Sequence, residues 1–383
     1  MKYYIIAGEP SGDLHGSKLL ESLANLDLTG SFRVWGGDLM AVQKRTTLVK
    51  HIRETAFMGV SEVIRNLPQI KKNIGFCKAD LLEHRPDVLI LIDYPGFNLR
   101  MAKFAKSIGI KVYYYISPKF WAWKEYRVER VKKFVDRMFL IFPFEIAFYQ
   151  KHAYKADYVG NPLFDSIASR RKEFRPTDEF RKVYGLDERP IVAILPGSRK
   201  QEIDSILPFQ LQTVRHFPNV QFVVAATNMF DISLYHKYIG DLPVKIVVNE
   251  TYELLHNAAA GLITSGTASL ETGLFQVPQV VCMRTSWLTY HLVKMVIKVK
   301  YLSLVNLILD RASAVELIQA DLNENRLVAE LSAILPGGDK LDRVRADYQE
   351  MEKIMGGIGA STRAATAMIA YLRTDVVSKN ESE

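Results

Sequence analysis

Short apolar runs alternate with helix-like patterns along most of the chain, and this alternation constrains the fold more than any other feature. In the first half the strand-like runs are Tyr3–Ala7, Arg33–Trp35, Asp87–Asp93, Lys111–Ile116, Arg137–Phe142 and Asp157–Gly160. In the second half they are Ile191–Leu195, Gln221–Ala226, Lys245–Val248, Ala260–Thr264 and Gln279–Met283. Apolar strands separated by helices are typical of parallel sheets covered on both faces. The pattern therefore predicts an α/β protein with two doubly wound domains, whose ligands bind at the carboxyl ends of the strands.

The domain boundaries are predicted from a change in composition. Arg170–Arg189 is rich in charge, contains Pro176, and is the best candidate for a linker. The predicted domains are residues 1–170 and 171–339, followed by terminal helices within 340–373 and a polar tail, 374–383, that we expect to be disordered. With 383 residues, 48% of them hydrophobic, the chain is long enough for two cores.

The basic balance of the chain points to an anionic partner without choosing one. The formal net charge is +8 and the isoelectric point is about 9.2, which would suit nucleic acid, an anionic membrane or a phosphorylated substrate. The basic residues are dispersed and no nucleic-acid motif is present, so nucleic acid is not expected. Two amphipathic stretches with lysines, Val60–Lys78 and Trp287–Leu309, either dock on an anionic bilayer or pack on their own core.

The sequence predicts a cytoplasmic protein. Its two cysteines, Cys77 and Cys282, make no disulfide framework and fit a reducing compartment. The apolar run after Met1 is too short for a signal peptide, and no window of about 18 apolar residues predicts a membrane span.

Two turns in the second half have the composition of a phosphate site. Gly197, Ser198 and Arg199 follow one predicted strand, and Ser265–Thr267 follows another, each before a helical pattern. Backbone N–H groups at a helix N-terminus favour an anion, and arginine binds phosphate through two N–H groups. A solvated basic turn and a capped helix are the alternatives for each turn alone, but together the two would hold a pyrophosphate. Glu271 lies four residues after Thr267 and can face the same place.

Three loops in the first half also follow strands. Glu9 and Asp13 lie in a loop that matches neither the dinucleotide fingerprint nor the phosphate loop of nucleotide triphosphatases; Asp13 could equally be a helix N-cap. Asp93 ends an apolar strand, where desolvation would make it a better base, although an aspartate before Pro-Gly could also cap a turn. Trp121 and Trp123 either line a pocket or pack their loop down.

No metal or cofactor is expected. The sequence has no D-x-D pair and no His/Cys cluster with metal-ligand spacing. If a diphosphate leaves during the reaction, protein cations and helix dipoles must stabilise it.

Seven motifs, in the right order over roughly residues 3–310, resemble the bacterial lipid-A-disaccharide synthases. They are AGEPSGD (Ala7–Asp13), FMGVSEV (Phe57–Val63), LIDYPGFN (Leu91–Asn98), ISPKFWAWK (Ile116–Lys124), LPGSR (Leu195–Arg199), SGTASLE (Ser265–Glu271) and YLSLVNLIL (Tyr301–Leu309). The first and fourth are specific to that family, whereas LPGSR and SGTASLE resemble loops of related glycosyltransferases. Gly96 stands where the family more often has an aspartate.

The resemblance implies a GT-B fold and an inverting transfer in lipid A and lipopolysaccharide biosynthesis of Gram-negative bacteria. The family moves 2,3-diacylglucosamine from UDP to the 6-hydroxyl of 2,3-diacylglucosamine 1-phosphate. It also implies a peripheral enzyme on the inner face of the inner membrane, with terminal helices that cross back to the first domain; a homodimer is left open. Two other hypotheses remain: a GT-B transferase for another lipid acceptor, such as the peptidoglycan N-acetylglucosamine step, and a non-catalytic sugar-nucleotide-binding protein.

By the same resemblance, Asp93 would be the general base, with Glu9 and Asn306 also catalytic. The implied substrate-binding residues are Ser11, Gly12, Asp13, Asn98, Trp121, Trp123, Gly197, Ser198, Arg199, Ser265, Gly266, Thr267 and Glu271. Arg199 and Ser265–Thr267 would hold the diphosphate, and Glu271 would accept hydrogen bonds from the ribose.

Overall fold

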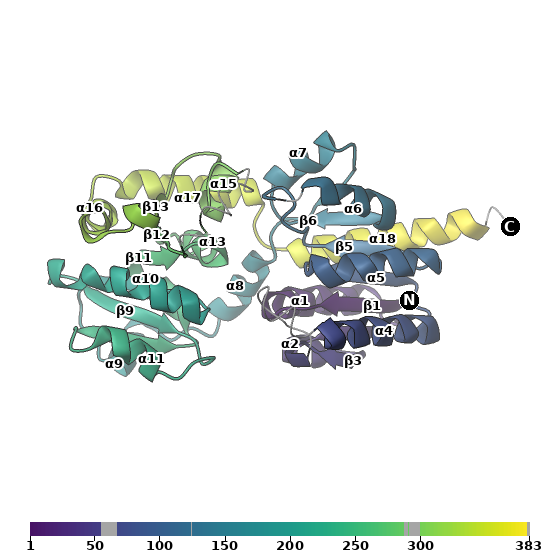
Figure 1. The fold of residues 1–383 in the computed structure, drawn as a ribbon, viewed down its shortest axis with the longest axis horizontal. Helices are drawn as coiled ribbons and strands as arrows, with labels where there is room; N and C mark the ends of the chain where they lie inside the picture. Colours follow the sequence, from purple (N-terminus) through teal and green to yellow (C-terminus); the bar gives the residue numbers. More distant parts are fainter. Residues whose placement is uncertain (55–66, 124, 287–289, 291–298, 381–383) are drawn as a thin grey trace. The chain divides into compact units, whose positions relative to one another are not determined.

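In a computed structural model the chain forms two compact units (Figure 1). Unit 1 comprises Met1–Ser166 and Gly356–Glu383, and unit 2 comprises Ile167–Met355. The structure describes residues 1–54, 67–123, 125–286, 290 and 299–380, with side chains up to residue 374. The motif Phe57–Val63 lies outside these residues, as do parts of Val60–Lys78 and Trp287–Leu309.

Unit 1 is built on a parallel sheet of seven strands in the order β3-β2-β1-β4-β5-β6-β7. The strands are β1 (Lys2–Ala7), β2 (Ser31–Gly36), β3 (Thr46–His51), β4 (Val88–Ile92), β5 (Lys111–Tyr115), β6 (Arg137–Leu140) and β7 (Asp157–Tyr158). Every residue of β4 is buried, as expected for an apolar strand covered on both faces. The strand order reverses between β1 and β4, and ligands of doubly wound sheets bind beyond the carboxyl ends at such a point.

The helices of unit 1 include one from the far end of the chain. They are α1 (Pro10–Leu26), α2 (Asp38–Ala41), α4 (Leu67–His84), α5 (Pro95–Ser107), α6 (Val128–Phe134), α7 (Phe144–Lys151) and α18 (Ala360–Asn380). The C-terminal helix α18 packs against α1 (Figure 1). Asp165 holds the start of α18, because its carboxylate accepts hydrogen bonds from the N–H groups of Gly359 (2.5 Å) and Ser361 (2.9 Å). Helix α8 (Leu163–Arg171) begins in unit 1 and continues into unit 2.

Unit 2 repeats the arrangement with a parallel sheet of six strands in the order β10-β9-β8-β11-β12-β13. The strands are β8 (Ile191–Leu195), β9 (Gln221–Ala226), β10 (Val244–Val248), β11 (Ala258–Thr264), β12 (Gln279–Met283) and β13 (Val315–Ile318). The helices are α9 (Thr177–Tyr184), α10 (Lys200–Gln212), α11 (Ser233–Ile239), α12 (Thr251–Asn257), α13 (Thr267–Leu274), α15 (Leu304–Leu309), α16 (Glu324–Ile334) and α17 (Leu341–Met355). Here the strand order reverses between β8 and β11.

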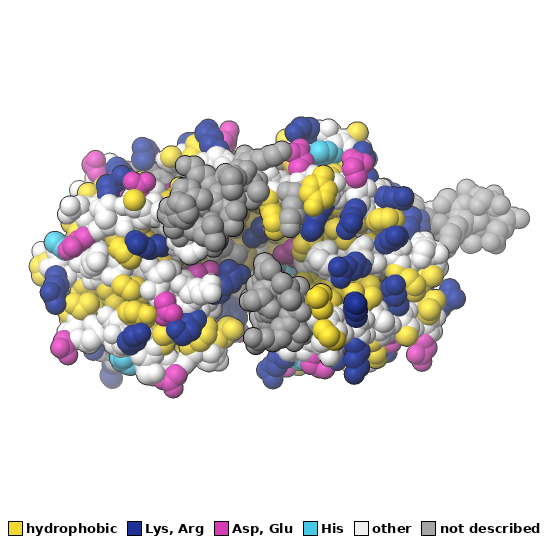
Figure 2. Space-filling model, viewed as in Figure 1, with side chains coloured by type: hydrophobic (Ala, Val, Ile, Leu, Met, Phe, Trp, Pro, Cys, Tyr) yellow, Lys and Arg dark blue, Asp and Glu magenta, His cyan; other side chains and the backbone are white. Residues whose placement is uncertain are grey.

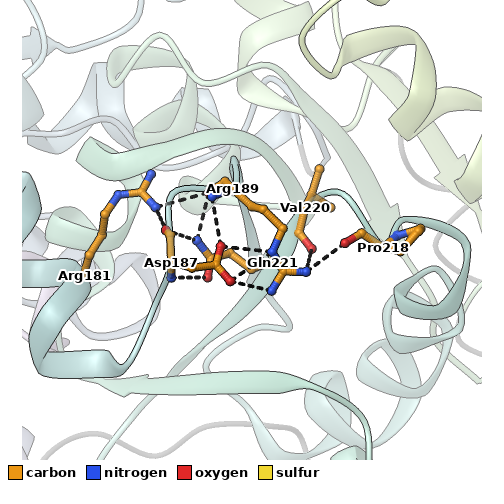
Figure 3. Close-up of polar contacts among 6 residues, drawn as sticks. All are labelled: Arg181, Asp187, Arg189, Pro218, Val220 and Gln221. Atoms are coloured by element: carbon orange, nitrogen blue, oxygen red, sulfur yellow. Dashed lines mark hydrogen bonds and ion pairs between the residues drawn. The ribbon is translucent and has the colours of Figure 1, made fainter.

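The stretch expected as a linker is ordered within unit 2. It contains α9, and its last residues are fixed to the start of β9 by a polar cluster (Figure 3). Arg189 binds the carboxylate of Asp187 through Nε (3.0 Å) and Nη2 (2.7 Å), and the Gln221 amide donates to the carbonyl of Asp187 (2.7 Å). Charged side chains of this stretch therefore make local hydrogen bonds and ion pairs in addition to facing solvent.

Several element boundaries differ from the sequence-based expectation. The predicted loop that contains Glu9 and Asp13 is largely helical, since α1 begins at Pro10, and α5 begins at Pro95, directly after the elbow at Asp93 and Tyr94. Proline fits the first turn of a helix, because it lacks the N–H that would have no partner there. Strands β3 and β13 have no apolar run and were not predicted. Among the described helices, none is both long and apolar enough to cross a membrane.

Candidate active site

The backbone at the end of β4 is strained, and this strain places Asp93. Asp93 (φ 42°) and Tyr94 (φ 47°) are both left-handed, which costs about 1–3 kcal/mol for each such residue unless the surroundings hold it. The buried amide of Asn98 donates to the carbonyls of Ile92 (3.2 Å) and Asp93 (2.8 Å), and the Tyr114 hydroxyl also donates to the Asp93 carbonyl. Asn98, predicted to bind substrate, thus holds the elbow that carries Asp93.

The ends of β1 and β4 are in close contact at this elbow. A Cβ atom added to Gly8 would lie 2.3 Å from Cγ of Tyr94, so the aromatic ring rests directly on the backbone after β1. Only glycine allows this approach. Glu9, the next residue, is half-buried and is the N-cap residue of α1, although its side chain makes no capping hydrogen bond.

Charges from two neighbouring segments act on the half-buried Asp93 carboxyl group. Burial and the Glu9 carboxylate raise its pKa, the Lys119 ammonium and a hydrogen bond from the Tyr94 backbone lower it, and the resulting pKa is about 6. Asp93 is therefore ionised at neutral pH but is a stronger base than an exposed aspartate.

Asp13 is not the N-cap of its own helix, because α1 begins three residues earlier. Instead its buried carboxylate accepts hydrogen bonds from the N–H groups of Gly37 (2.7 Å), Leu39 (3.1 Å) and Met40 (3.0 Å), at the start of α2. Asp13 is a cap of a different helix. Of its neighbours in α1, Ser11 is exposed and Gly12 is buried against Ala7.

The two tryptophans of the loop after β5 have different environments. The indole N–H of half-buried Trp121 donates to Oε1 of Glu145 (3.2 Å), whereas Trp123 is 44% exposed. Glu145 is buried at 1% exposure, and its burial raises its pKa to about 8. The loop is packed down through Trp121 and presents Trp123 to solvent.

The predicted phosphate turns follow the adjacent strands β8 and β11 of unit 2. Gly197–Arg199 leads into α10, where Arg199 is the N-cap residue, and Ser265–Gly266 leads into α13, which begins at Thr267. Gly266 has φ 137°, a conformation that only glycine adopts readily. Parallel β8 and β11 end at the same edge, so both turns lie at the carboxyl end of one sheet.

The first turn already holds an anion of its own. Oε2 of Glu202 accepts hydrogen bonds from the N–H groups of Ser198 (3.1 Å) and Arg199 (3.2 Å), and Oε1 pairs with the exposed Arg199 guanidinium (3.1 Å). A carboxylate therefore occupies donors expected for a phosphate.

Glu271 and Asn306 are committed to protein partners that sequence reasoning missed. Glu271 accepts a hydrogen bond from the Tyr252 hydroxyl (2.6 Å), and burial raises its pKa. The Asn306 amide donates to the Ala314 carbonyl (2.8 Å) and to Glu316 (2.9 Å). Its oxygen accepts from two backbone N–H groups, those of Ser313 and Ala314, both at 2.9 Å. Asn306 is 1% exposed, so as placed it positions a loop.

Glu316 connects that loop to the second of the two predicted phosphate turns. It accepts a hydrogen bond from the N–H of Leu302 (3.0 Å). The carbonyl of Leu302 in turn accepts a hydrogen bond from the Ser265 hydroxyl (3.4 Å). Glu316 and Tyr252 are distant in sequence from the residues they hold, and no local motif marks them. Only their partners' positions reveal them.

Comparison with known proteins identifies the family. The family model described as lipid-A-disaccharide synthetase matches residues 3–370. The lipid-A-disaccharide synthase of Geobacter metallireducens is 35% identical over 375 residues, which is 96% of each chain. The chain belongs to this family. The synthase of Myxococcus xanthus is also 35% identical, over 376 residues covering 96% of this chain and 97% of the relative, so the resemblance seen in the motifs is confirmed.

Solved structures with low sequence identity establish the fold. The UDP-GlcNAc 2-epimerase of Neisseria meningitidis, bound to UDP-GlcNAc, has a TM-score of 0.65 at 12% identity and covers 98% of this chain and 100% of its own. A UGT transferase from Siraitia grosvenorii in complex with UDP has a TM-score of 0.58 at 12% identity, covering 97% and 99%. The predicted fold class is confirmed: the chain has the GT-B fold, with two Rossmann-like domains.

Proposed function

We propose that this protein condenses UDP-2,3-diacylglucosamine with 2,3-diacylglucosamine 1-phosphate, giving the β(1→6) disaccharide 1-phosphate and UDP. Membership of the synthase family supports the reaction. The observation that carries the residue assignment is the strained elbow at Asp93, because strain of this kind clusters at functional sites. The raised pKa of Asp93 also suits a general base.

In the proposed reaction the acceptor 6-hydroxyl oxygen attacks C1 of the donor sugar. The bond from C1 to the oxygen of UDP breaks with inversion, and the hydroxyl proton passes to Asp93. Glu9 acts beside it, since its charge raises the pKa of Asp93 and makes that carboxylate more basic.

The leaving diphosphate is assigned to the turns of unit 2. The N–H groups that start α10 and α13, together with Arg199, would stabilise its charge. The diphosphate would replace the carboxylate of Glu202 on the first turn. Glu271 would accept hydrogen bonds from the ribose hydroxyls, with Tyr252 holding the carboxylate in place.

A transfer assay with purified protein tests the function. We expect UDP release and disaccharide 1-phosphate from the two diacylated substrates, with EDTA present, because the sequence has no D-x-D metal pair. Binding of UDP without turnover would instead favour the sugar-nucleotide-binding hypothesis. Loss of transfer in EDTA that Mg²⁺ restores would contradict the assignment of the leaving group to protein cations and helix dipoles.

The membrane surface is proposed as a partner because the substrates are acylated. Helices α4 and α5 pack together in unit 1, and basic side chains gather over them (Figure 2). Lys71, Lys72, Arg100 and Lys103 are exposed there, and among the described residues none has an ion-pair partner within 4.0 Å. Phe76, 48% exposed, adds an apolar group to this basic face. Lysine and arginine near an anionic bilayer contribute about 1 kcal/mol each.

Vesicle sedimentation tests this face. Replacing Lys71, Lys72, Arg100 and Lys103 with glutamine should reduce binding to vesicles containing phosphatidylglycerol by about tenfold or more. The matched control replaces Lys237, Lys245, Arg343 and Arg345, four exposed cations of unit 2, and should bind as the unaltered protein does. Equal binding by all three proteins would show that α4 and α5 do not form the docking face.

A further inference from the structure

The loop that follows β5, residues 117–123, leaves the sheet through a strained residue. Ile116 has φ 66°, a conformation in which a β-branched residue is an outlier. Its N–H donates to the Phe139 carbonyl (3.1 Å), and the loop beyond it must be held by other contacts. Strain at an active-site edge persists only where the surroundings determine it.

Helix α7 holds this loop at two points. Glu145 and Tyr149 lie four residues apart, so they share one face of the helix. The Tyr149 hydroxyl is 2.7 Å from Oγ of Ser117, and Oε1 of Glu145 accepts the indole N–H of Trp121 (3.2 Å). Glu145 and Tyr149 are 1% and 0% exposed, so neither contact is shared with bulk water.

Glu145 is itself fixed in position. Its second carboxylate oxygen, Oε2, accepts the N–H groups of Ile141 (3.3 Å) and Phe142 (3.0 Å). The Trp121 ring meets Phe144 edge-on at 4.8 Å. A buried carboxyl group with three donors and an aromatic neighbour forms a rigid anchor for Trp121.

Lys119 lies between the two held points. It is exposed, but Pro118 and Phe120 on either side are buried, so its backbone has little freedom. Its loop leaves the sheet next to Asp93, since β4 and β5 pair in parallel and the N–H of Asp93 donates to the Tyr115 carbonyl (3.3 Å). From this position its ammonium lowers the pKa of Asp93. The other groups that face Asp93 are Glu9 from the start of α1, Tyr114 from β5, and Tyr94 beside it.

We propose that Glu145 is a positioning residue, which holds Trp121 and thereby keeps the Lys119 ammonium beside the base Asp93. The inference rests on the proposed function of Asp93. When the anchor is lost, the loop moves and the cation leaves the carboxylate. Asp93 then holds its proton more tightly, and the pH at which kcat/KM is half-maximal on the acid side rises.

The test is the pH dependence of kcat/KM for transfer. Lys119→Met removes the cation directly. It should raise the pH at which the acid limb of the profile is half-maximal by about half a pH unit, the scale for a partly solvated charge pair. Glu145→Ala and Trp121→Phe should move the limb in the same direction. Glu145→Gln keeps an oxygen for the indole N–H but places its NH2 group against the N–H groups of Ile141 and Phe142. Its shift should therefore lie between those of Glu145→Ala and the unaltered protein.

Trp121→Phe keeps an aromatic ring in place, so it decides the test if Glu145→Ala does not fold. Glu129→Gln is the matched control, because Glu129 is an exposed glutamate of α6 paired only with Lys132 among described residues; its limb should not move. An unmoved limb in Lys119→Met would overturn the inference. So would an unmoved limb in both Trp121→Phe and Glu145→Ala, or in Trp121→Phe alone if Glu145→Ala does not fold. The proposed role of Asp93 fails separately, if Asp93→Ala retains near-normal transfer.

Discussion

The two units place different chemical groups at the ends of the same scaffold. Each has a parallel sheet whose strand order reverses between two central strands, β1 and β4 in unit 1 and β8 and β11 in unit 2. After β1 and β4 come the carboxylates Glu9 and Asp93, and after β8 and β11 come turns of glycine, serine and threonine at helix N-termini. The residues that follow the strands therefore decide whether an edge presents carboxylates or backbone N–H donors.

The units also differ in how their edges are held. At Asp93 the backbone is strained and is fixed by the buried side chains of Asn98 and Tyr114. At Arg199 the turn is an exposed helix start occupied by its own glutamate. A base needs a fixed position and a raised pKa, whereas an anion site needs free or exchangeable donors. Substitutions on each side can break or sharpen this contrast.

The largest effect should come from Asp93→Ala. We expect transfer to fall by at least about a hundredfold, the usual scale for losing a general base. UDP affinity, measured by calorimetry, should change less than about twofold, because Asp93 belongs to unit 1 and the proposed diphosphate site belongs to unit 2. Glu129→Gln is the charge-matched control. Near-normal transfer by Asp93→Ala would show that Asp93 is not the general base, and the contrast between the two units would then fail.

Arg199→Ala should weaken UDP binding by about tenfold, since a charge-assisted hydrogen bond contributes about 1.5–3 kcal/mol and Arg199 must first leave Glu202. Arg215→Ala removes an exposed arginine of the 3-10 turn that precedes β9, at the opposite end of the strands, and serves as the control. Unchanged affinity in calorimetry would contradict the diphosphate assignment of unit 2.

Asp93→Asn should stabilise the protein at neutral pH by about 1 kcal/mol. The folded-state pKa, about 6, lies above the unfolded value near 4. The folded state thus binds more protons between these values, and stability falls as pH rises from about 4 to 6. Asparagine removes that loss and tolerates the left-handed backbone. Urea unfolding should show the gain at pH 7 and little at pH 3.5; a gain equal at both would point to a cause other than titration.

The smallest effect is expected from Tyr252→Phe. Removing its hydroxyl frees the Glu271 carboxylate that it holds at 2.6 Å. We expect the preference for UDP over 2′-deoxy-UDP to fall about threefold, the scale of one neutral hydrogen bond. Tyr238→Phe, which removes a hydroxyl from Asp204 elsewhere in unit 2, is the control. An unchanged preference would mean that Glu271 does not read the ribose through this contact.

The sequence by itself determined which segments form the central strands and which residues follow them. Buried parallel strands need continuous apolar runs, and residues after such strands must meet at one edge of the sheet. For this reason the amino-acid sequence alone assigns the Asp93 exit and the Gly197–Arg199 and Ser265–Thr267 turns to the carboxyl edges of the sheets. The edge strands β3 and β13 could not be assigned in this way. Their sequences are only partly apolar, most of their residues are not buried, and their pairing depends on a neighbouring strand.

Only the tertiary structure decided which long-range partners each polar side chain has. Asp13 looks like a local cap but binds the N-terminus of α2. The side-chain amide of Asn306 makes hydrogen bonds with Ser313, Ala314 and Glu316. Glu145 has no motif, yet it anchors Trp121 across 24 residues of chain. A hydrogen bond extends only about 3 Å, so its partner is set by how strands and helices pack. Sequence spacing alone does not contain that information.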